Sequence, residues 1–569
     1  MKIREPVGRP ARDEERTAPK GPAPSGLDRV VMRLLPSLSD MLFICVALGV
    51  LLTLQGRLLG EDGDAAWNLR IGSYILSHGI PRVEFMLGPT LGKPTLYYEW
   101  LAQVVYALAL RLGGLNGVVA LAALFVALEV TMLFSALRRR GVPLLLAYPL
   151  TLAGAWLTSS TWTARAQHFT LLLTFAWAEL LWLYWRTGNR RLLWLFPISA
   201  ALWANLHGGF VGGLLMLGIA VVLAWALPAR QGGARPRALA LTFAGSAAAT
   251  LLNPWGIGLW LHIAGYLHDP VIMSTTREFL SPDFHTLYAQ TFLALLVLLA
   301  AAWLWLARQR MPESERIALD GAPREREWLG EAAFSPLAIA LAALWTLLAM
   351  QSVRFVALWA LVVLPILGAS LTAALRTAHL AEPGQPWGRA LIAVIRLAGR
   401  LNRRLGRVES LDALISRGVW ATAGVVLILL LVLNGGALPG SRTPILNAQF
   451  DARTFPVAAA QRLARDGIPA GNGFTTYTWG SYLDYALPAF HPFVDSRSDA
   501  YGPRILKQYL DIVGLAPDWS ALLDQYRVRW ALLPVNMPLA QALALRPGWT
   551  CSPADSSGVA VLCQQAPAP

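Results

Sequence analysis

Carboxylates that could serve as a general base stand at Asp62 and Asp64, directly after an apolar segment at 38–56. A carboxylate beside an attacking hydroxyl or amine can remove its proton. The plainer alternative is that Asp64 only caps the amphipathic helix predicted after it, which Gly79 ends. We predict both as catalytic residues, with Asp64 ahead of Asp62, because a base can also begin a helix.

Polar residues recur at the ends of later apolar segments, all at one predicted level of the molecule. A guanidinium suits phosphate, which it binds through two parallel hydrogen bonds. Charged groups at such depths tend to face a cavity in the protein, because exposing them to lipid is costly. The pattern indicates a site for an acidic, lipid-linked substrate. The predicted substrate-binding residues are Arg165, His168, Asn205, His207, Arg277, Glu278 and Arg354.

Histidines and carboxylates in the predicted outer loops leave open a divalent cation as a cofactor. Histidines and carboxylates are common metal ligands, but the sequence has no closely spaced pair of the HExxH type. We therefore assign no residue to a metal. The side chains that this alternative would use are His207, His262, His268 and His285, with Asp62 or Asp64.

The composition predicts that membrane helices position these residues. Hydrophobic residues make up 55% of the chain and charged residues only 14%, with a mean hydropathy of +0.47. Soluble proteins carry about 25% charged residues. The apolar blocks have about the length that crosses a hydrocarbon core of roughly 30 Å. An isolated segment in lipid must satisfy its own backbone hydrogen bonds, so the blocks are predicted to be helices.

Basic residues in the short loops orient the chain across the cytoplasmic (inner) membrane. We predict a cytoplasmic N-terminus and a C-terminal part outside, with 99–113 as a helix at the outer interface. The net charge of +14 then reflects arginine-rich inner loops rather than nucleic-acid binding. About eleven spans are predicted, at 38–56, 116–137, 142–160, 168–185, 191–206, 210–228, 238–253, 289–307, 334–351, 355–375 and 418–437.

Three parts are predicted along the chain. Residues 1–33 are polar and proline-rich, which is typical of a disordered cytoplasmic tail. Residues 34–437 form a transmembrane domain with outer loops at 57–98 and 253–288. The fold class is thus an α-helical polytopic membrane protein with a small extracytoplasmic α/β domain at 438–569, where short apolar runs alternate between helix and strand patterns.

Within 438–569, the stretches 473–487 and 491–499 are predicted to form a strand, a turn and a second strand. Asp495, Arg497 and Asp499 would then share one face of a strand. They could bind an acceptor, but we favour an ion-paired surface or a brace against the transmembrane domain.

The three cysteines divide between two environments. Cys551 and Cys563 flank a turn in the outer domain, where an oxidising environment permits a disulfide, which we favour over two free thiols. Cys45 lies in the first span and is interpreted as a packing residue.

Several motifs carry a resemblance to a known family. They are "DGDAAWNLRIGSYILSHGIP" (62–81), "NLHG" (205–208), "NPWG" (253–256), "WGSYL" (479–483) and "FVDSRSDAY" (493–501). With this layout the chain resembles the GT-C superfamily of polytopic glycosyltransferases. That superfamily includes the protein O-mannosyltransferases and the aminoarabinose transferases of lipid A. The motifs are most similar to those of a bacterial branch of the superfamily.

The resemblance implies transfer of a sugar from a polyprenyl-phosphate-linked donor to a glycan, lipid or protein acceptor. Asp64 would be the base, and Arg354, Arg165 and Arg277 would stabilise the departing phosphate. Two departures from the family pattern are Asn68, where a histidine is common, and "VEFM" (83–86), where a second acidic motif is usual.

Two other functions remain open from the sequence. One is a polymerase or ligase of lipid-linked oligosaccharides, which would use the same cavity. The other is a non-catalytic transporter or scaffold, for which polar groups in mid-span and internal repeats would be expected.

Overall fold

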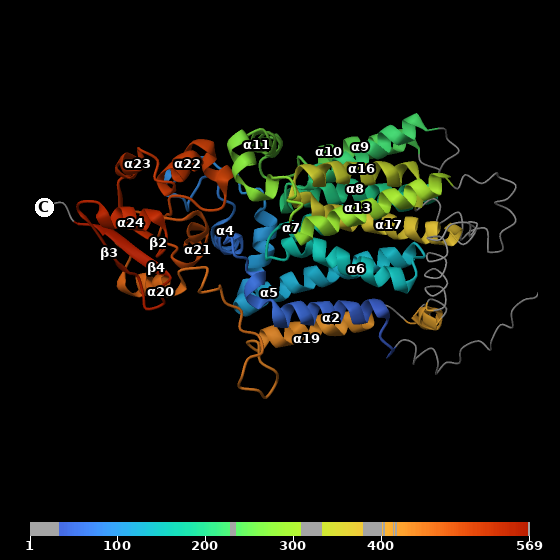
Figure 1. The fold of residues 1–569 in the computed structure, drawn as a ribbon, viewed down its shortest axis with the longest axis horizontal. Coiled ribbons are helices and arrows are strands. Elements are labelled where there is room, and N and C mark those ends of the chain that lie inside the picture. The colour runs from blue at the N-terminus through green and yellow to red at the C-terminus, as the bar shows by residue number, and fades with distance from the viewer. Residues whose placement is uncertain are drawn as a thin grey trace, which may run out of the picture.

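The computed structural model describes residues 34–227, 235–308, 333–378, 401, 404–412, 415 and 418–566. Within them, a bundle of long helices is followed by a smaller part that contains the sheet and lies at one end of the bundle (Figure 1). The predicted disordered tail at 1–33 lies outside the described residues. So do most of the predicted inner segments 308–333 and 376–417.

Each predicted span coincides with a helix of the bundle. Three stretches of the described chain are long and apolar enough to cross a membrane: Trp100–Arg139, Leu287–Arg308 and Val353–Arg376. Eleven spans therefore remain a prediction. The helices are α2 (Leu38–Thr53), α5 (Trp100–Arg139), α6 (Leu144–Thr158), α7 (Gln167–Thr187), α8 (Leu195–Leu206), α9 (Phe210–Ala226), α10 (Pro236–Ala249), α13 (Leu287–Arg308), α16 (Pro336–Gln351), α17 (Val356–Ala378) and α19 (Val419–Leu433).

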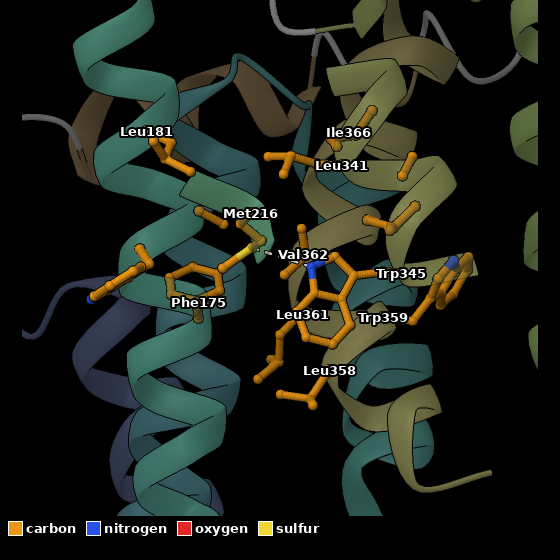
Figure 2. Packing of buried hydrophobic residues seen from close by; sticks show 14 of the residues in the cluster. Phe175, Leu181, Met216, Leu341, Trp345, Leu358, Trp359, Leu361, Val362 and Ile366 are labelled. Atoms are coloured by element: carbon orange, nitrogen blue, oxygen red, sulfur yellow. Dashed lines mark hydrogen bonds between the residues drawn. The ribbon is translucent and has the colours of Figure 1, made fainter. Parts of the chain in front are cut away.

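The bundle core consists of large apolar side chains from helices that are distant in sequence. Figure 2 shows Trp345 of α16 facing Met216 of α9, with Phe175 of α7 close by. A buried indole N–H needs a partner, and that of Trp345 lies 3.2 Å from the sulfur of Met216. Cys45 of α2 is exposed, so its interpretation as a packing residue is wrong.

Helix α5 contains a break that separates two helices. Gly113 and Gly114 have non-helical backbone angles, and Gly114 has a φ of +59°. The segment predicted as a helix at 99–113 is therefore a helix of its own, and its place at the outer interface of the membrane stays a prediction. It packs on α4 (Asp64–His78) so closely that a Cβ on Gly72 would lie 2.0 Å from the carbonyl oxygen of Gln103.

The C-terminal part is an α/β layer built on four strands. The order is β1-β2-β4-β3, with β1 and β2 parallel and the other pairs antiparallel. Cys551 on β3 lies opposite Cys563 on β4, and the predicted disulfide between them is present. The elements are α20 (Val457–Asp466), β1 (Asn472–Thr475), α21 (Tyr477–Ala486), α22 (Ser498–Val513), α23 (Trp519–Gln525), β2 (Val528–Pro534), α24 (Pro538–Leu545), β3 (Trp549–Pro553) and β4 (Ala560–Gln565).

The predicted strand pair at 473–487 and 491–499 is wrong. Only the first residues form a strand, β1, after which Thr476 accepts a hydrogen bond from the backbone N–H of Trp479 and begins α21. The stretch 491–497 contains no strand, and α22 starts at Ser498. Asp495, Arg497 and Asp499 therefore do not share the face of a strand.

Candidate functional site

A cavity of about 740 Å³ lies where the bundle meets the C-terminal part. Its walls come from the first turns of α4 and α5, from loops at the bundle end, and from α21, α22 and the residues between them. Helices α4 and α11 (Ile257–Leu267) lie in this junction (Figure 1). The predicted site residues that line the cavity are Asp62, Asp64, Arg165, His207, Arg277, Glu278 and Arg354.

Asp64 is the first residue of α4, but its side chain does not cap the helix. The N-cap is Gly63, whose φ of +83° favours glycine. The carboxylate that accepts the backbone N–H of Asp64 is Asp62, at 3.1 Å. The capping alternative for Asp64 is therefore wrong, and its carboxylate is available to the cavity.

Three side chains hold the Asp64 carboxylate in place. Its Oδ2 lies 2.6 Å from Nη1 of Arg165. Its Oδ1 accepts a hydrogen bond from the indole N–H of Trp67 at 3.2 Å and another from the hydroxyl of Ser496. The carboxylate of the predicted base is thus fixed in one orientation from both sides of the cavity.

Arg165 holds three carboxylates together. Its Nη1 lies 3.1 Å from Asp62, 2.6 Å from Asp64 and 3.3 Å from Glu278. Desolvation in the cavity and the charge of Asp64 raise the pKa of Asp62 to about 6, against the opposing effect of Arg165. One guanidinium faces three acids, so this end of the cavity carries excess negative charge.

Two further arginines, Arg277 and Arg354, line the cavity near Glu278. Arg354 lies 3.5 Å from Glu278 and stacks over the ring of Phe279 at 5.5 Å. Burial alone would raise the pKa of Glu278, but Arg354 and Arg165 lower it below its ordinary value. Arg277 has no carboxylate within ion-pair distance among the residues that the structure describes. Its guanidinium is therefore available to an anion.

A neutral pair, Glu99 and His207, lies beside Arg354. Nδ1 of His207 accepts the backbone N–H of Gly209 at 2.9 Å, and Nε2 lies 3.3 Å from Nη2 of Arg354 and 3.4 Å from Glu99. Burial and the nearby Arg354 and Arg165 lower the pKa of His207 to about 3. Burial also raises the pKa of Glu99 to about 8, with Arg354 opposing it. Both groups are mostly uncharged at neutral pH.

The raised pKa of Glu99 predicts a pH-dependent change in stability. The unfolded chain releases this proton near pH 4.5 and the folded chain near pH 8, so stability falls between these values and then levels off. Glu99→Gln keeps a neutral hydrogen-bonding group. In detergent it should melt higher than the wild type at pH 8, by roughly 3 °C, and equally at pH 4.5. A variant that is no more stable at pH 8 would contradict the raised pKa.

Two predicted site residues lie outside the cavity lining. His168 is fully buried between α7 and α5, with Nδ1 2.8 Å from Glu129. Asn205 accepts a hydrogen bond from the indole N–H of Trp100 and donates one to the carbonyl of Leu252, both at 2.8 Å. Both residues connect helices. Their positions near helix ends did not reveal which face of the helix they occupy.

Several residues that line the cavity were not assigned from the sequence. Glu99 directly precedes α5, and Ser496 and Asp499 belong to the "FVDSRSDAY" motif. Asp499, in the first turn of α22, lies 3.1 Å from His262 of α11. Both acids are visible in the sequence, but only folding places them in the cavity.

Arg497 confirms the ion-paired alternative that the sequence favoured, although the pairs are buried rather than on the surface. Its guanidinium lies 2.7 Å from Asp495 and 3.1 Å from Glu84, which stands between α4 and α5. Burial would raise the pKa of Glu84, but Arg497 lowers it below its ordinary value. The displaced acid of "VEFM" is therefore one half of a brace between the two parts of the chain.

Among the described residues, no group of three or more histidine, cysteine, aspartate or glutamate side chains is placed to hold a metal ion. The guanidinium of Arg165 is the cation that these acids surround.

Comparison with solved structures finds similar folds among archaeal oligosaccharyltransferases of Archaeoglobus fulgidus. One is AglB in complex with an inhibitory peptide and a dolichol-phosphate, with a TM-score of 0.47 and 13% identity over 89% of this chain and 70% of that chain. The other is an oligosaccharyltransferase tethered with an acceptor peptide containing the NVT sequon, with a TM-score of 0.43 and 11% identity over 88% and 69%.

No protein-family model matches this chain, and no curated protein sequence does either. At this level of similarity the two solved structures carry no argument about the function of this chain.

Proposed function

We propose that this protein is a glycosyltransferase. It moves a sugar from a polyprenyl-phosphate-linked donor to an acceptor at the outer face of the cytoplasmic membrane. The observation that carries the proposal is that Asp64, Arg277 and Arg354 line one cavity at the end of a bundle of apolar helices. A carboxylate and two guanidiniums that line one cavity suit a reaction in which a proton is removed at one point and a phosphate departs at another.

The proposed reaction is a single displacement at the anomeric carbon. Asp64 takes the proton of the acceptor hydroxyl or amine as the acceptor oxygen or nitrogen forms its bond to the sugar. The bond between that carbon and the phosphate oxygen breaks, and polyprenyl phosphate leaves with the electron pair. Attack opposite the leaving group inverts the anomeric centre. No step is assigned to a metal ion.

The ion pairs suggest different roles for the arginines. Three acids surround Arg165, so an approaching phosphate would meet net negative charge there. We therefore assign Arg165 to holding the carboxylates. Arg277 and Arg354 are assigned to the phosphate, because Arg277 has no carboxylate partner among the described residues and Arg354 has one, at 3.5 Å.

Arg277→Gln is predicted to weaken use of the donor. Losing one charged hydrogen bond to the phosphate should lower kcat/KM for the donor roughly 10- to 100-fold, while KM for the acceptor stays unchanged. Steady-state kinetics with varied donor measures this effect. The matched control is Arg453→Gln, an exposed arginine outside the cavity lining, which should behave as the wild type. Equal kinetics of the two variants would contradict the phosphate assignment.

The function itself is tested by release of polyprenyl phosphate. Purified protein in vesicles is incubated with a panel of polyprenyl-phosphate sugars and with membrane extracts as a source of acceptor. Transfer should yield free polyprenyl phosphate and a glycosylated product. A product that grows by repeated addition of lipid-linked units would favour the polymerase alternative. Absence of release with every donor would contradict the proposal.

The topology belongs to the same proposal. The cavity would open at the extracytoplasmic face, with 438–569 outside and the N-terminus inside. A cysteine-accessibility or reporter-fusion assay on both termini tests this orientation, and a cytoplasmic location of 438–569 would contradict it.

A further inference from the structure

We infer that Ser496 is a positioning residue for Asp64, so that the domain at 438–569 completes the catalytic site. The inference rests on the proposed role of Asp64 as base. It assigns to the C-terminal domain a contribution to chemistry, in addition to its contribution to the walls of the cavity.

The first observation is the direct contact between the two domains at the base. The hydroxyl of Ser496 donates to Oδ1 of Asp64, across 432 positions in sequence. The indole N–H of Trp67 lies 3.2 Å from the same Oδ1 and 2.8 Å from the hydroxyl oxygen of Ser496. Ser496 and Trp67 thus occupy Oδ1 together, while Oδ2 faces Arg165.

The second observation is that Ser496 is itself held rigidly. Its backbone N–H donates to the hydroxyl oxygen of Ser481 at 2.9 Å, and its carbonyl accepts from the hydroxyl of Tyr477 at 2.7 Å. The hydroxyl of Ser481, which is fully buried, lies 2.9 Å from that of Ser496. The Ser496 hydroxyl oxygen accepts hydrogen bonds from Trp67 and Ser481. Its own proton is therefore donated to Asp64.

The third observation is the close approach that two glycines permit. A Cβ on Gly63, just before Asp64, would lie 2.6 Å from Cβ of Ser481 and 2.8 Å from the carbonyl of Thr478. A Cβ on Gly480 would lie 2.0 Å from the carbonyl of Val494. Helix α21 therefore packs closely against the start of α4 on one side and against the segment 491–497, which carries Ser496, on the other.

The chemical consequence concerns the orientation of the base. Hydrogen bonds to one oxygen of a carboxylate fix its plane and favour its ionised form. With Oδ1 occupied, the remaining lone pair of Oδ2 is the part of Asp64 that can meet an acceptor. Misplacing a reacting group by about 1 Å can cost about 100-fold in rate, so a fixed plane matters to kcat more than to binding.

The experiment compares Ser496→Ala with Ser496→Thr in the full-length protein. The alanine variant should lose about 10- to 100-fold in kcat, with KM for donor and acceptor unchanged. The threonine variant keeps the hydroxyl and should recover most of the activity. Ser520→Ala, on α23 and outside the cavity lining, is the matched control.

A merely structural role would lower the amount of folded protein without lowering kcat per folded molecule. Wild-type kcat for Ser496→Ala, with Asp64→Asn inactive, would overturn the positioning role while leaving the proposed function intact. Activity of Asp64→Asn would instead overturn the role of Asp64 as base, on which the inference rests. In the Asp64→Asn background, Ser496→Ala should cause no further loss, because the two act as a unit.

Discussion

Asp64→Asn should lower sugar transfer roughly 10²- to 10⁴-fold, the largest effect on activity of any single replacement in the cavity. Asparagine has nearly the shape of aspartate and keeps an oxygen for Trp67 and Ser496, but it cannot take a proton. Arg165 retains Asp62 and Glu278 as partners at 3.1 and 3.3 Å, so its charge stays compensated. Release of polyprenyl phosphate by purified variants in vesicles measures the effect.

The matched control for this variant is Glu61→Gln, which removes a neighbouring exposed acid that does not line the cavity. It should behave as the wild type. Asp62→Asn distinguishes the two candidate bases, and we expect it to retain more activity than Asp64→Asn. A ranking in which Asp62→Asn is the inactive variant would transfer the role of base to Asp62.

Arg497→Gln should destabilise the contact between the two parts of the chain by roughly 3–5 kcal/mol. The guanidinium is 7% exposed and pairs with two side chains, Glu84 and Asp495, that are fully buried. Removing the cation leaves these carboxylates uncompensated in a setting where water cannot reach them. Burial and the charge of Asp495 already raise the pKa of the neighbouring Asp484, so the variant must protonate more acids or separate the two parts.

Thermal unfolding in detergent and limited proteolysis between 438 and 456 measure this destabilisation. Arg546→Gln is the matched control, because its partner Asp524 keeps 59% exposure and such a pair is worth at most about 1 kcal/mol. Arg497→Gln should unfold at lower temperature and be cut faster than Arg546→Gln. Equal behaviour of the two variants would show that the brace contributes little.

The sequence alone predicted the helical bundle, the C-terminal α/β part, the disulfide and seven of the residues that line the cavity. Apolar blocks predict helices, because the length of a block and the need to satisfy its backbone hydrogen bonds depend only on neighbouring residues. The start of α4 at Asp64 and its end before Gly79 are equally local. Arg165, Arg277 and Arg354 could be predicted because a charged residue at the end of an apolar segment has few favourable places to lie.

Tertiary structure alone decided which faces and distant segments meet. His168 turns toward Glu129 and Asn205 toward Trp100, although both stand at the same helix ends as the residues that line the cavity. Ser496 reaches Asp64 only because α21 packs onto Gly63. The position of a residue at the end of a predicted helix indicates how deep in the molecule that residue lies. The direction of its side chains depends on packing between segments hundreds of residues apart, and no local pattern carries that information.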